Sequence, residues 1–232
     1  MFDQSGEWLQ KQRLKWKTAR LFRLIDRMND RGTENWLEGW KTKAEKAYRE
    51  ADRMNDPECL PILRQMILQH QQPEKEAFRE AAYYLMGRLL SRCPVEEDIA
   101  FYIEQMMKES NQDVQFRMLV HLGRIQIPET QSMEGIIALV HSERELLQEA
   151  AIYALGSQQS ARCREVLCGI AALDDWKKHQ GAIMAAQSAL RKNGTMDDIH
   201  VLEKNLHSAS RNIRENAAAV MEEIRKRNIA AK

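Results

Sequence analysis

The sequence predicts an all-α protein in which helix pairs stack into an α-solenoid. One observation is a repeated octet: residues 80–87 read Glu-Ala-Ala-Tyr-Tyr-Leu-Met-Gly, and residues 149–156 read Glu-Ala-Ala-Ile-Tyr-Ala-Leu-Gly. The copies start 69 residues apart, or two units of about 34 to 35 residues, and a weaker copy ends between them at Gly123. The composition, with 12 Met and only 5 Pro, favours helix, and no segment alternates β-branched residues between turn signals.

Residues 1–56 are expected to form two basic, Trp-rich capping helices ahead of a repeat array that spans 57–232 as one continuous domain. The first helix covers 8–30, where apolar residues recur at near-helical spacing and six basic residues precede the first acidic one. The first contains Trp8 and Trp16, and the second contains Trp36 and Trp40. Since the ends of a repeat array expose apolar surface, we expect these tryptophans to cover it.

The array is predicted to contain about five helix pairs. The first helices of the pairs are expected at residues 75–90, 112–125, 143–156, 177–192 and 211–227. The second helices are expected at residues 58–70, 95–109, 131–141, 161–173 and 196–207. Paired alanines in the first helices would let neighbouring helices approach closely, and the glycine that closes each octet is expected to end its helix.

Composition excludes several classes of protein. The chain has 35 basic and 34 acidic residues, so its net charge does not indicate nucleic acid or a membrane surface. Charged residues interrupt every apolar run before the roughly 20 residues that a membrane span needs. The four cysteines have no framework spacing and no apolar leader is evident, which predicts a cytoplasmic protein.

The repeated segments resemble HEAT repeats over roughly residues 57–230. The resemblance rests on Arg79-Glu80-Ala81-Ala82 with Leu85-Met86-Gly87, Asp113-Val114 with Arg117, Glu149-Ala150-Ala151 with Leu155-Gly156, and Ile213-Arg214-Glu215-Asn216-Ala217. It implies that the first helix of each pair lies on the convex side of the array. The second helix would then supply a concave, ligand-binding face.

On that basis the chain is predicted to be a non-enzymatic, armadillo-like scaffold that binds a protein or peptide, with Phe101 as one anchor. Residues expected to point outward on the second helices are Phe101, Glu104, Gln105, Lys108, Arg162, Glu165, His200 and Lys204. Residues expected to face inward are Ile99, Ile103, Met106, Val166, Leu167, Ile170, Ile199, Leu202 and Leu206.

Catalytic motifs are not evident, and no cofactor or metal ion is expected. The sequence contains no Gly-rich phosphate loop, no serine nucleophile elbow and no Cys-x-x-Cys pair. His70, His141 and His207 fall in alternate repeats, some 20 Å apart at about 10 Å per helix layer, which is too far for a shared metal. Cys163 and Cys168 have arginine neighbours that favour a thiolate, but buried apolar roles are the preferred interpretation.

Catalytic solenoids of similar architecture provide alternatives. Deoxyhypusine hydroxylases carry repeated His-Glu pairs, which this sequence does not have, and phycobilin lyases are a looser match that stays open. Alkylpurine DNA glycosylases use tryptophans and an aspartate in a basic concave channel. Here Trp176 follows Asp174 and Asp175 and precedes Lys177 and Lys178, which keeps a DNA-processing activity as an alternative.

The basic opening helix is a second route to nucleic acid. Its Lys11, Arg13, Lys15 and Arg20 could contact nucleic acid, anionic lipid or an acidic groove of a partner. The preferred interpretation is structural, with this helix capping the array.

Overall fold

A computed structural model describes residues 4–30 and 42–230, and this part of the chain is all-α, as the sequence predicts. A single parallel bridge between Ile127 and Gln158 is the one β-type pairing in these residues. The α-helices are α1 (Gln4–Asn29), α2 (Lys43–Ala51), α3 (Cys59–Gln69), α4 (Glu76–Leu90), α5 (Glu96–Lys108), α6 (Gln112–Leu122), α7 (Glu134–Leu139), α8 (Glu145–Leu155), α9 (Ala161–Ala171), α10 (Trp176–Asn193), α11 (Ile199–Asn205) and α12 (Arg211–Ala230). Short 3₁₀ turns at Pro73–Lys75 and Met196–Asp198 precede α4 and α11.

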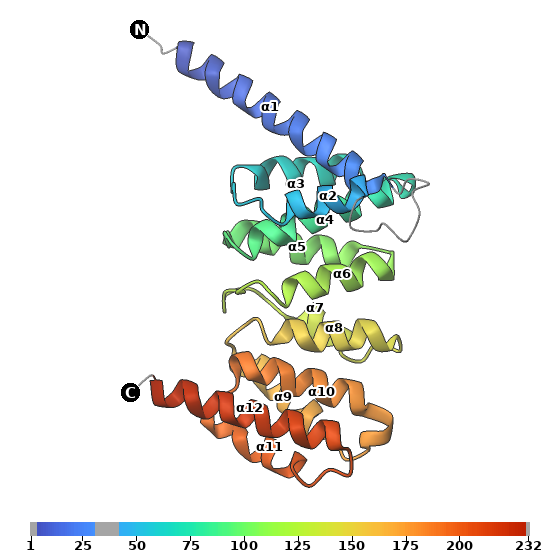
Figure 1. Ribbon diagram of the computed structural model, residues 1–232, viewed down its shortest axis with the longest axis vertical. Coiled ribbons are helices and arrows are strands. Elements are labelled where there is room, and N and C mark those ends of the chain that lie inside the picture. Colours follow the sequence, from blue (N-terminus) through green and yellow to red (C-terminus); the bar gives the residue numbers. More distant parts are fainter. Residues whose placement is uncertain (1–3, 31–41, 231–232) are drawn as a thin grey trace. The chain divides into compact units, whose positions relative to one another are not determined.

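The chain divides into two compact units, and the division falls inside α5. Unit 1 extends to Tyr102, and unit 2 begins at Ile103. In each unit, helices that follow one another in the chain pack side by side (Figure 1). The observed helices match the predicted pairs to within a few residues. The five prolines lie between helices or in a first turn, where a missing N–H group costs least. Trp36 and Trp40 lie outside the described residues.

In unit 1, the C-terminal half of α1 packs on α2, α3 and α4. Its Leu21, Leu24 and Ile25 are almost completely buried, at helical spacing. Beside them, the ring of His70 stacks on Phe78 with ring centroids 4.2 Å apart. This histidine therefore has a packing role at the end of α3.

A buried lysine anchors the same half of α1 to the segment before α3. The side chain of Lys17 is 7% exposed, and its Nζ lies 2.5 Å from both Asp56 Oδ2 and Glu58 Oε2. Burial lowers the pKa of Lys17, but the hydrogen bonds and charges of the two carboxylates outweigh it, so the pKa is raised. The ammonium group therefore stays charged and fixes α1 against this segment.

Unit 2 has two layers of helices. Helices α6, α8, α10 and α12, of 11 to 20 residues, form the first layer and contact one another in that order. Helices α7, α9 and α11, of 6 to 11 residues, form the second layer, and each packs on a first-layer helix. The layers correspond to the first and second helices predicted from the sequence.

Small residues set the spacing in the first layer. Ala150, Ala151 and Gly156 of the second octet are buried, and a Cβ added at Gly156 would lie 2.8 Å from the Cα of Ala189 on α10. The helix ends at the closing glycine in two of the three copies, because Gly123 and Gly156 are the C-cap residues of α6 and α8, whereas Gly87 lies inside α4. Gly156 has a right-handed φ of −65° that any residue can adopt, so glycine is required there for close approach and not for the backbone conformation.

Buried side-chain amides connect successive repeats of unit 2. Nε2 of Gln158 donates to the carbonyls of Pro128 and Gln131, each at 2.7 Å. Nδ2 of Asn193 in turn donates to the carbonyl of Gln158 at 2.9 Å. Because buried carbonyls without donors are costly, these amides let the loops between helices pack inside the unit.

Lys192 reaches across two helices of the first layer. Its Nζ lies 3.9 Å from the ring centroid of Tyr153 on α8 and donates to the carbonyl of Gly123 at the end of α6. The carbonyl of Lys192 accepts a hydrogen bond from Arg227 on α12. One residue thus connects all four first-layer helices.

Two glycines provide a matched test of this packing. We predict that Gly156→Ala lowers the free energy of unfolding by about 1–3 kcal/mol, because the methyl group overlaps Ala189. Gly169, on the exposed side of α9, has open space around an added Cβ. Gly169→Ala should therefore raise stability by about 0.5–1 kcal/mol. Urea denaturation measures both, and effects of the same sign would contradict the packing described.

A second prediction concerns Glu149, the first residue of the octet. Burial, and then the charge of Glu145, raises the pKa of the Glu149 carboxyl. The folded state therefore holds this proton more tightly than the unfolded state, and stability falls as pH rises above the ordinary glutamate pKa of about 4.3.

Glu149→Gln should remove that loss. The melting temperature of the variant should exceed that of the wild type at neutral pH, and the difference should vanish below the ordinary glutamate pKa. The exposed Glu129→Gln serves as the control. A difference that is constant over pH would show that Glu149 is not the titrating group.

Candidate functional site

A polar face runs over the C-terminal end of α5, which lies in unit 2, and over the second-layer helices α7, α9 and α11. We call it the second-layer face and define it by the exposed residues Glu104, Lys108, Glu134, Arg162, Glu165, Gly169, His200 and Lys204. Neighbouring helices are joined along it: Nε of Arg162 on α9 lies 3.6 Å from Oε1 of Glu134 on α7, and Nε of Arg164 lies 3.9 Å from Oδ2 of Asp198 before α11. The face is therefore continuous from α7 to α11.

Most of the predicted outward residues are exposed as expected. Glu104 pairs with Lys108 one turn away, and Nη1 of Arg162 lies 3.0 Å from Oε2 of Glu165. Among the predicted core positions, the six buried residues are Ile99, Ile103, Met106, Leu167, Ile199 and Leu202, while Val166, Ile170 and Leu206 are half-buried.

Gln105 does not point outward as predicted. Its side chain is 5% exposed, because Gln105 lies three residues after the fully buried Tyr102 and shares its side of α5. The side chain of Gln105 is therefore not available to contact a ligand.

Phe101, the predicted anchor, lies in unit 1 and is half-buried. The Cζ of Arg64 lies 5.3 Å from its ring centroid. Hydrogen bonds from Arg64 to Glu97 and Asp98 raise the pKa of this arginine and hold the guanidinium over the ring. One face of Phe101 is thus already occupied.

Gly169 is a candidate that inspection of the sequence had not identified. It follows Arg162 and Glu165 at helical spacing and opens the middle of α9 to solvent. An interior helix glycine costs roughly 0.5–1 kcal/mol relative to alanine, yet no neighbour within 4 Å needs the space. The sequence feature that could have identified Gly169 is its position in the middle of a predicted helix, away from any predicted turn.

The first half of α1 does not cap the unit. Every residue from Glu7 to Trp16 is exposed, and the side chains of Trp8 and Trp16 are 60% and 57% exposed. The prediction that the tryptophans cover the end of the array is therefore wrong for these two residues, because the buried positions of α1 begin only at Lys17. Lys11, Arg13 and Lys15 are exposed on the same segment.

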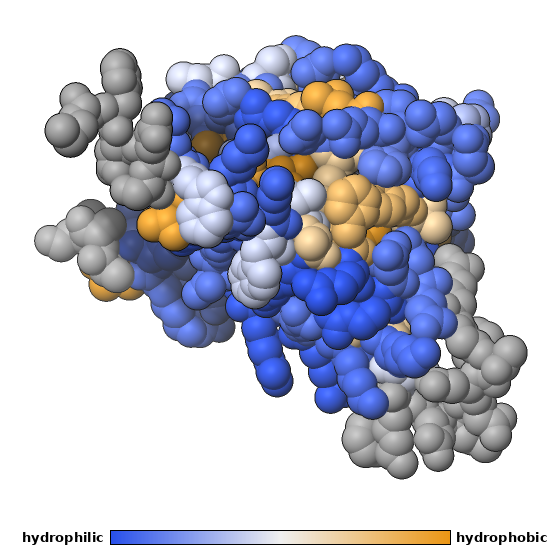
Figure 2. Space-filling model, turned by 90° about the horizontal axis from the view of Figure 1, so that it is seen from above, coloured by the Kyte–Doolittle hydropathy of each residue, from blue (hydrophilic) through white to orange (hydrophobic). Residues whose placement is uncertain are grey.

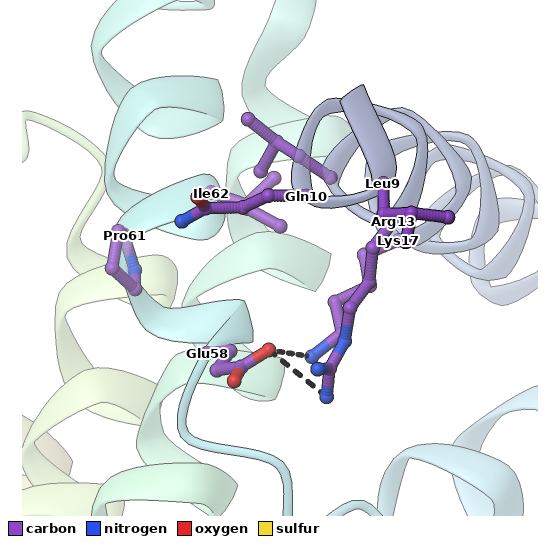
Figure 3. A pocket seen from close by; sticks show the side chains of 8 residues that line it. Leu9, Gln10, Arg13, Lys17, Glu58, Pro61 and Ile62 are labelled. Carbon is purple, nitrogen blue, oxygen red and sulfur yellow. Dashed lines mark hydrogen bonds and ion pairs between the residues drawn. The ribbon is translucent and has the colours of Figure 1, made fainter. Parts of the chain in front are cut away.

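One side of this exposed segment faces α3 across an open pocket of about 600 Å³ (Figure 3). Leu9 and Leu14 of α1 and Pro61 and Ile62 of α3 are its apolar lining. At its floor, Arg13 and Lys17 converge on the carboxylate of Glu58, at 3.3 and 2.5 Å.

The other side of α1 forms a basic groove with α2. Two cavities of about 680 and 530 Å³ lie along it and share Arg20 and Glu50. The space-filling view from the end where α1 lies shows hydrophilic residues over most of the surface, with separate apolar patches among them (Figure 2). We call the lining of these two cavities the α1–α2 groove.

The tryptophan of the predicted glycosylase-like site lines none of the three cavities described above. Trp176 is half-buried at the start of α10. Asp175 caps α10 by accepting from the backbone N–H of Lys178. Nζ of Lys177 lies 5.9 Å from the Trp176 ring centroid, and both lysines are exposed.

Metal and thiol chemistry have little support in the described residues. They contain no group of three or more His, Cys, Asp or Glu placed to hold a metal ion. Burial raises the pKa of Cys163, and burial together with the neighbouring Asp198 raises the pKa of Cys168 to about 12. These thiols are therefore poor nucleophiles despite their arginine neighbours.

Comparison with known proteins identifies the fold class. No protein-family model and no curated protein matches the sequence. Among solved structures, the chain is similar to a designed armadillo repeat protein in complex with the peptide (KR)4, with a TM-score of 0.53 at 15% identity over 88% of this chain and 99% of that one. A second designed armadillo repeat protein aligns with a TM-score of 0.49 at 14% identity over 88% and 99% of the two chains.

Human deoxyhypusine hydroxylase in complex with glycerol aligns with a TM-score of 0.45 at 11% identity, over 91% of this chain and 98% of that one. The likeness with a TM-score above 0.5, together with the layered helices, shows that the chain is an all-α helical-repeat solenoid. Within residues 4–30 and 42–230, no helix combines the length and apolar character needed to cross a membrane.

The thiol environments lead to a third prediction. Cys59 and Cys163 are buried and Cys168 has a strongly raised pKa, whereas Cys93 is half-exposed. In the folded protein, the thiol reagent DTNB should modify Cys93 in a fast phase and the other three slowly. Cys93→Ser should remove the fast phase, and a fast phase that survives would show that another thiol is accessible.

Proposed function

We propose that the chain is a non-enzymatic scaffold that binds an extended segment of a protein or peptide along the second-layer face of unit 2. The observation that carries this proposal is the exposure of charged side chains on successive second-layer helices with Gly169 between them. Rigid helices hold these side chains in fixed register, so little conformational entropy is lost on binding. The open space at Gly169 would let a ligand backbone approach α9 closely.

The designed relative in complex with (KR)4 supports a peptide ligand for this fold. The second-layer face differs in charge from a surface suited to a purely basic peptide, since Arg162 and Lys204 stand among Glu104, Glu134 and Glu165. We infer that the ligand carries charges of both signs. Phe101 is not part of this proposed face, because it lies in unit 1 and one face of its ring is occupied by Arg64.

We also propose that the repeats are HEAT-like. Each repeat of about 34 to 35 residues contains two helices, as HEAT repeats do, whereas armadillo repeats contain three. A cytoplasmic location stays a prediction from the cysteine pattern. A glycosylase activity at Trp176 is not proposed, because the neighbouring Asp175 acts as a helix cap.

A fourth prediction tests the binding face. Peptides selected from a displayed random library against the full chain should bind in calorimetry with micromolar dissociation constants. Glu165→Lys combined with Lys204→Glu leaves the net charge unchanged and should weaken binding by at least about tenfold, as loss of charged contacts at an interface does.

The matched control is Glu215→Lys combined with Lys226→Glu on α12 of the first layer, where all these residues are exposed. The control should bind selected peptides like the wild type. If the control no longer binds the peptides while the second-layer variant still binds them, the binding site lies on the first layer and the proposal is refuted.

A further inference from the structure

We propose that the α1–α2 groove of unit 1 binds single-stranded nucleic acid, with arginine side chains holding phosphates and exposed tryptophan rings stacking on bases. This surface is separate from the second-layer face of unit 2. The two proposals are independent, and either can fail without the other.

The charge of the groove is the first argument. Its cations outnumber its carboxylates by six to three: the lining contains Arg20, Arg23, Arg27, Lys46, Arg49 and Arg53 against Asp26, Glu50 and Asp56. Five of the six cations are arginines, whose planar N–H groups bind phosphate through two parallel hydrogen bonds. The groove thus attracts a phosphate-rich ligand even though the whole chain is nearly neutral.

Two of the carboxylates are already engaged by cations. Glu50 accepts from Arg27 at 2.5 Å and from Arg20 at 3.4 Å, and the hydrogen bond from Arg27 holds the pKa of Glu50 below its ordinary value. Asp56 accepts from the buried Lys17. These carboxylates hold the side chains of Arg20, Arg27 and Lys17 in place, and they compete only weakly with a ligand for the other cations of the groove.

Other cations are available to a ligand. Lys46 and Arg53 are exposed, and within the described part of the chain neither forms an ion pair. Among contacts within residues 4–30 and 42–230, Arg23 uses only its Nε, which donates to the carbonyl of Ala19 at 3.2 Å. These three side chains can each meet a phosphate without breaking a contact of the fold.

Exposed aromatic rings are the second argument. Trp16, Arg20, Arg23 and Arg27 share one side of α1 at helical spacing, and the Cζ of Arg20 lies 5.8 Å from the Trp16 ring centroid. Trp8 lies two turns earlier, about 12 Å along the helix at 1.5 Å per residue. Aromatic platforms leading into a cationic groove are the arrangement that binds single strands, because unpaired bases can stack on them.

This geometry disfavours other polyanions. A duplex keeps its bases stacked inside, so exposed tryptophans would gain little from it. A helix that binds an anionic membrane places apolar and basic residues on opposite sides. In α1, Trp16 and Arg20 share a side, while Leu14 faces the pocket beside α3.

The test measures fluorescence anisotropy of labelled oligouridylate and oligodeoxythymidylate of about 12 nucleotides with the full chain. Binding should weaken with salt, with a log–log slope of about −2 if three phosphates are neutralised at roughly 0.7 per phosphate. Lys46→Glu combined with Arg53→Glu should weaken binding at least about tenfold and flatten that slope. Trp16→Ala should weaken binding about fivefold or more and leave the slope unchanged.

The charge-matched control is Lys177→Glu combined with Lys178→Glu on α10, which should bind like the wild type. Circular dichroism melts verify that each variant folds. An equal loss in the control, or no salt-sensitive binding by the wild type, would overturn the proposal. So would tighter binding to a duplex, to polyglutamate or to phosphatidylserine vesicles than to the single strands.

Discussion

The close approach of first-layer helices is the constraint on which unit 2 depends. Larger side chains at this contact would push neighbouring helices apart and stretch the hydrogen bonds that the buried amides make between repeats. At Gly156, a single added carbon would meet the backbone of Ala189, so the distance between α8 and α10 is set by the absence of a side chain. The repeated octet is therefore a spacing element, and its tyrosine and glutamate lie at the edge of that contact, where they are half-buried.

The two candidate surfaces use side chains that the packing does not need. On the second layer, helices of 6 to 11 residues expose alternating charges and one glycine whose space no neighbour fills. On α1, the residues from Glu7 to Trp16 are exposed, so Trp8 and Trp16, of a residue type that is ordinarily buried, are in contact with solvent. In both places the fold supplies rigidity, while the exposed side chains supply the chemistry.

The fold could be predicted from the sequence because its determinants are local and repeated: alanine pairs, helical periodicity and prolines between helices. The candidate surfaces were less predictable because they depend on where one helix stops touching another. The periodicity of α1 continues past the last contact, so nothing in it marks Trp8 and Trp16 as exposed. Gln105 was misplaced because a polar residue type suggests solvent, although its position beside Tyr102 buries it. The α1–α2 groove combines arginines of α1 with basic residues of α2 and the turn after it, and no local pattern records that these side chains line one groove.

The bridge made by Lys192 limits how far unit 2 can behave as a linear chain of repeats. In an ideal array each repeat contacts only its neighbours, and stability is a sum of nearest-neighbour terms. Lys192 instead joins α10 to Gly123, two first-layer helices away, and binds Arg227 on the next helix through its carbonyl. Next-nearest coupling of this kind penalises partly unfolded states in which α10 and α12 have separated from α6 and α8. Unit 2 is thereby biased toward unfolding as a single cooperative unit.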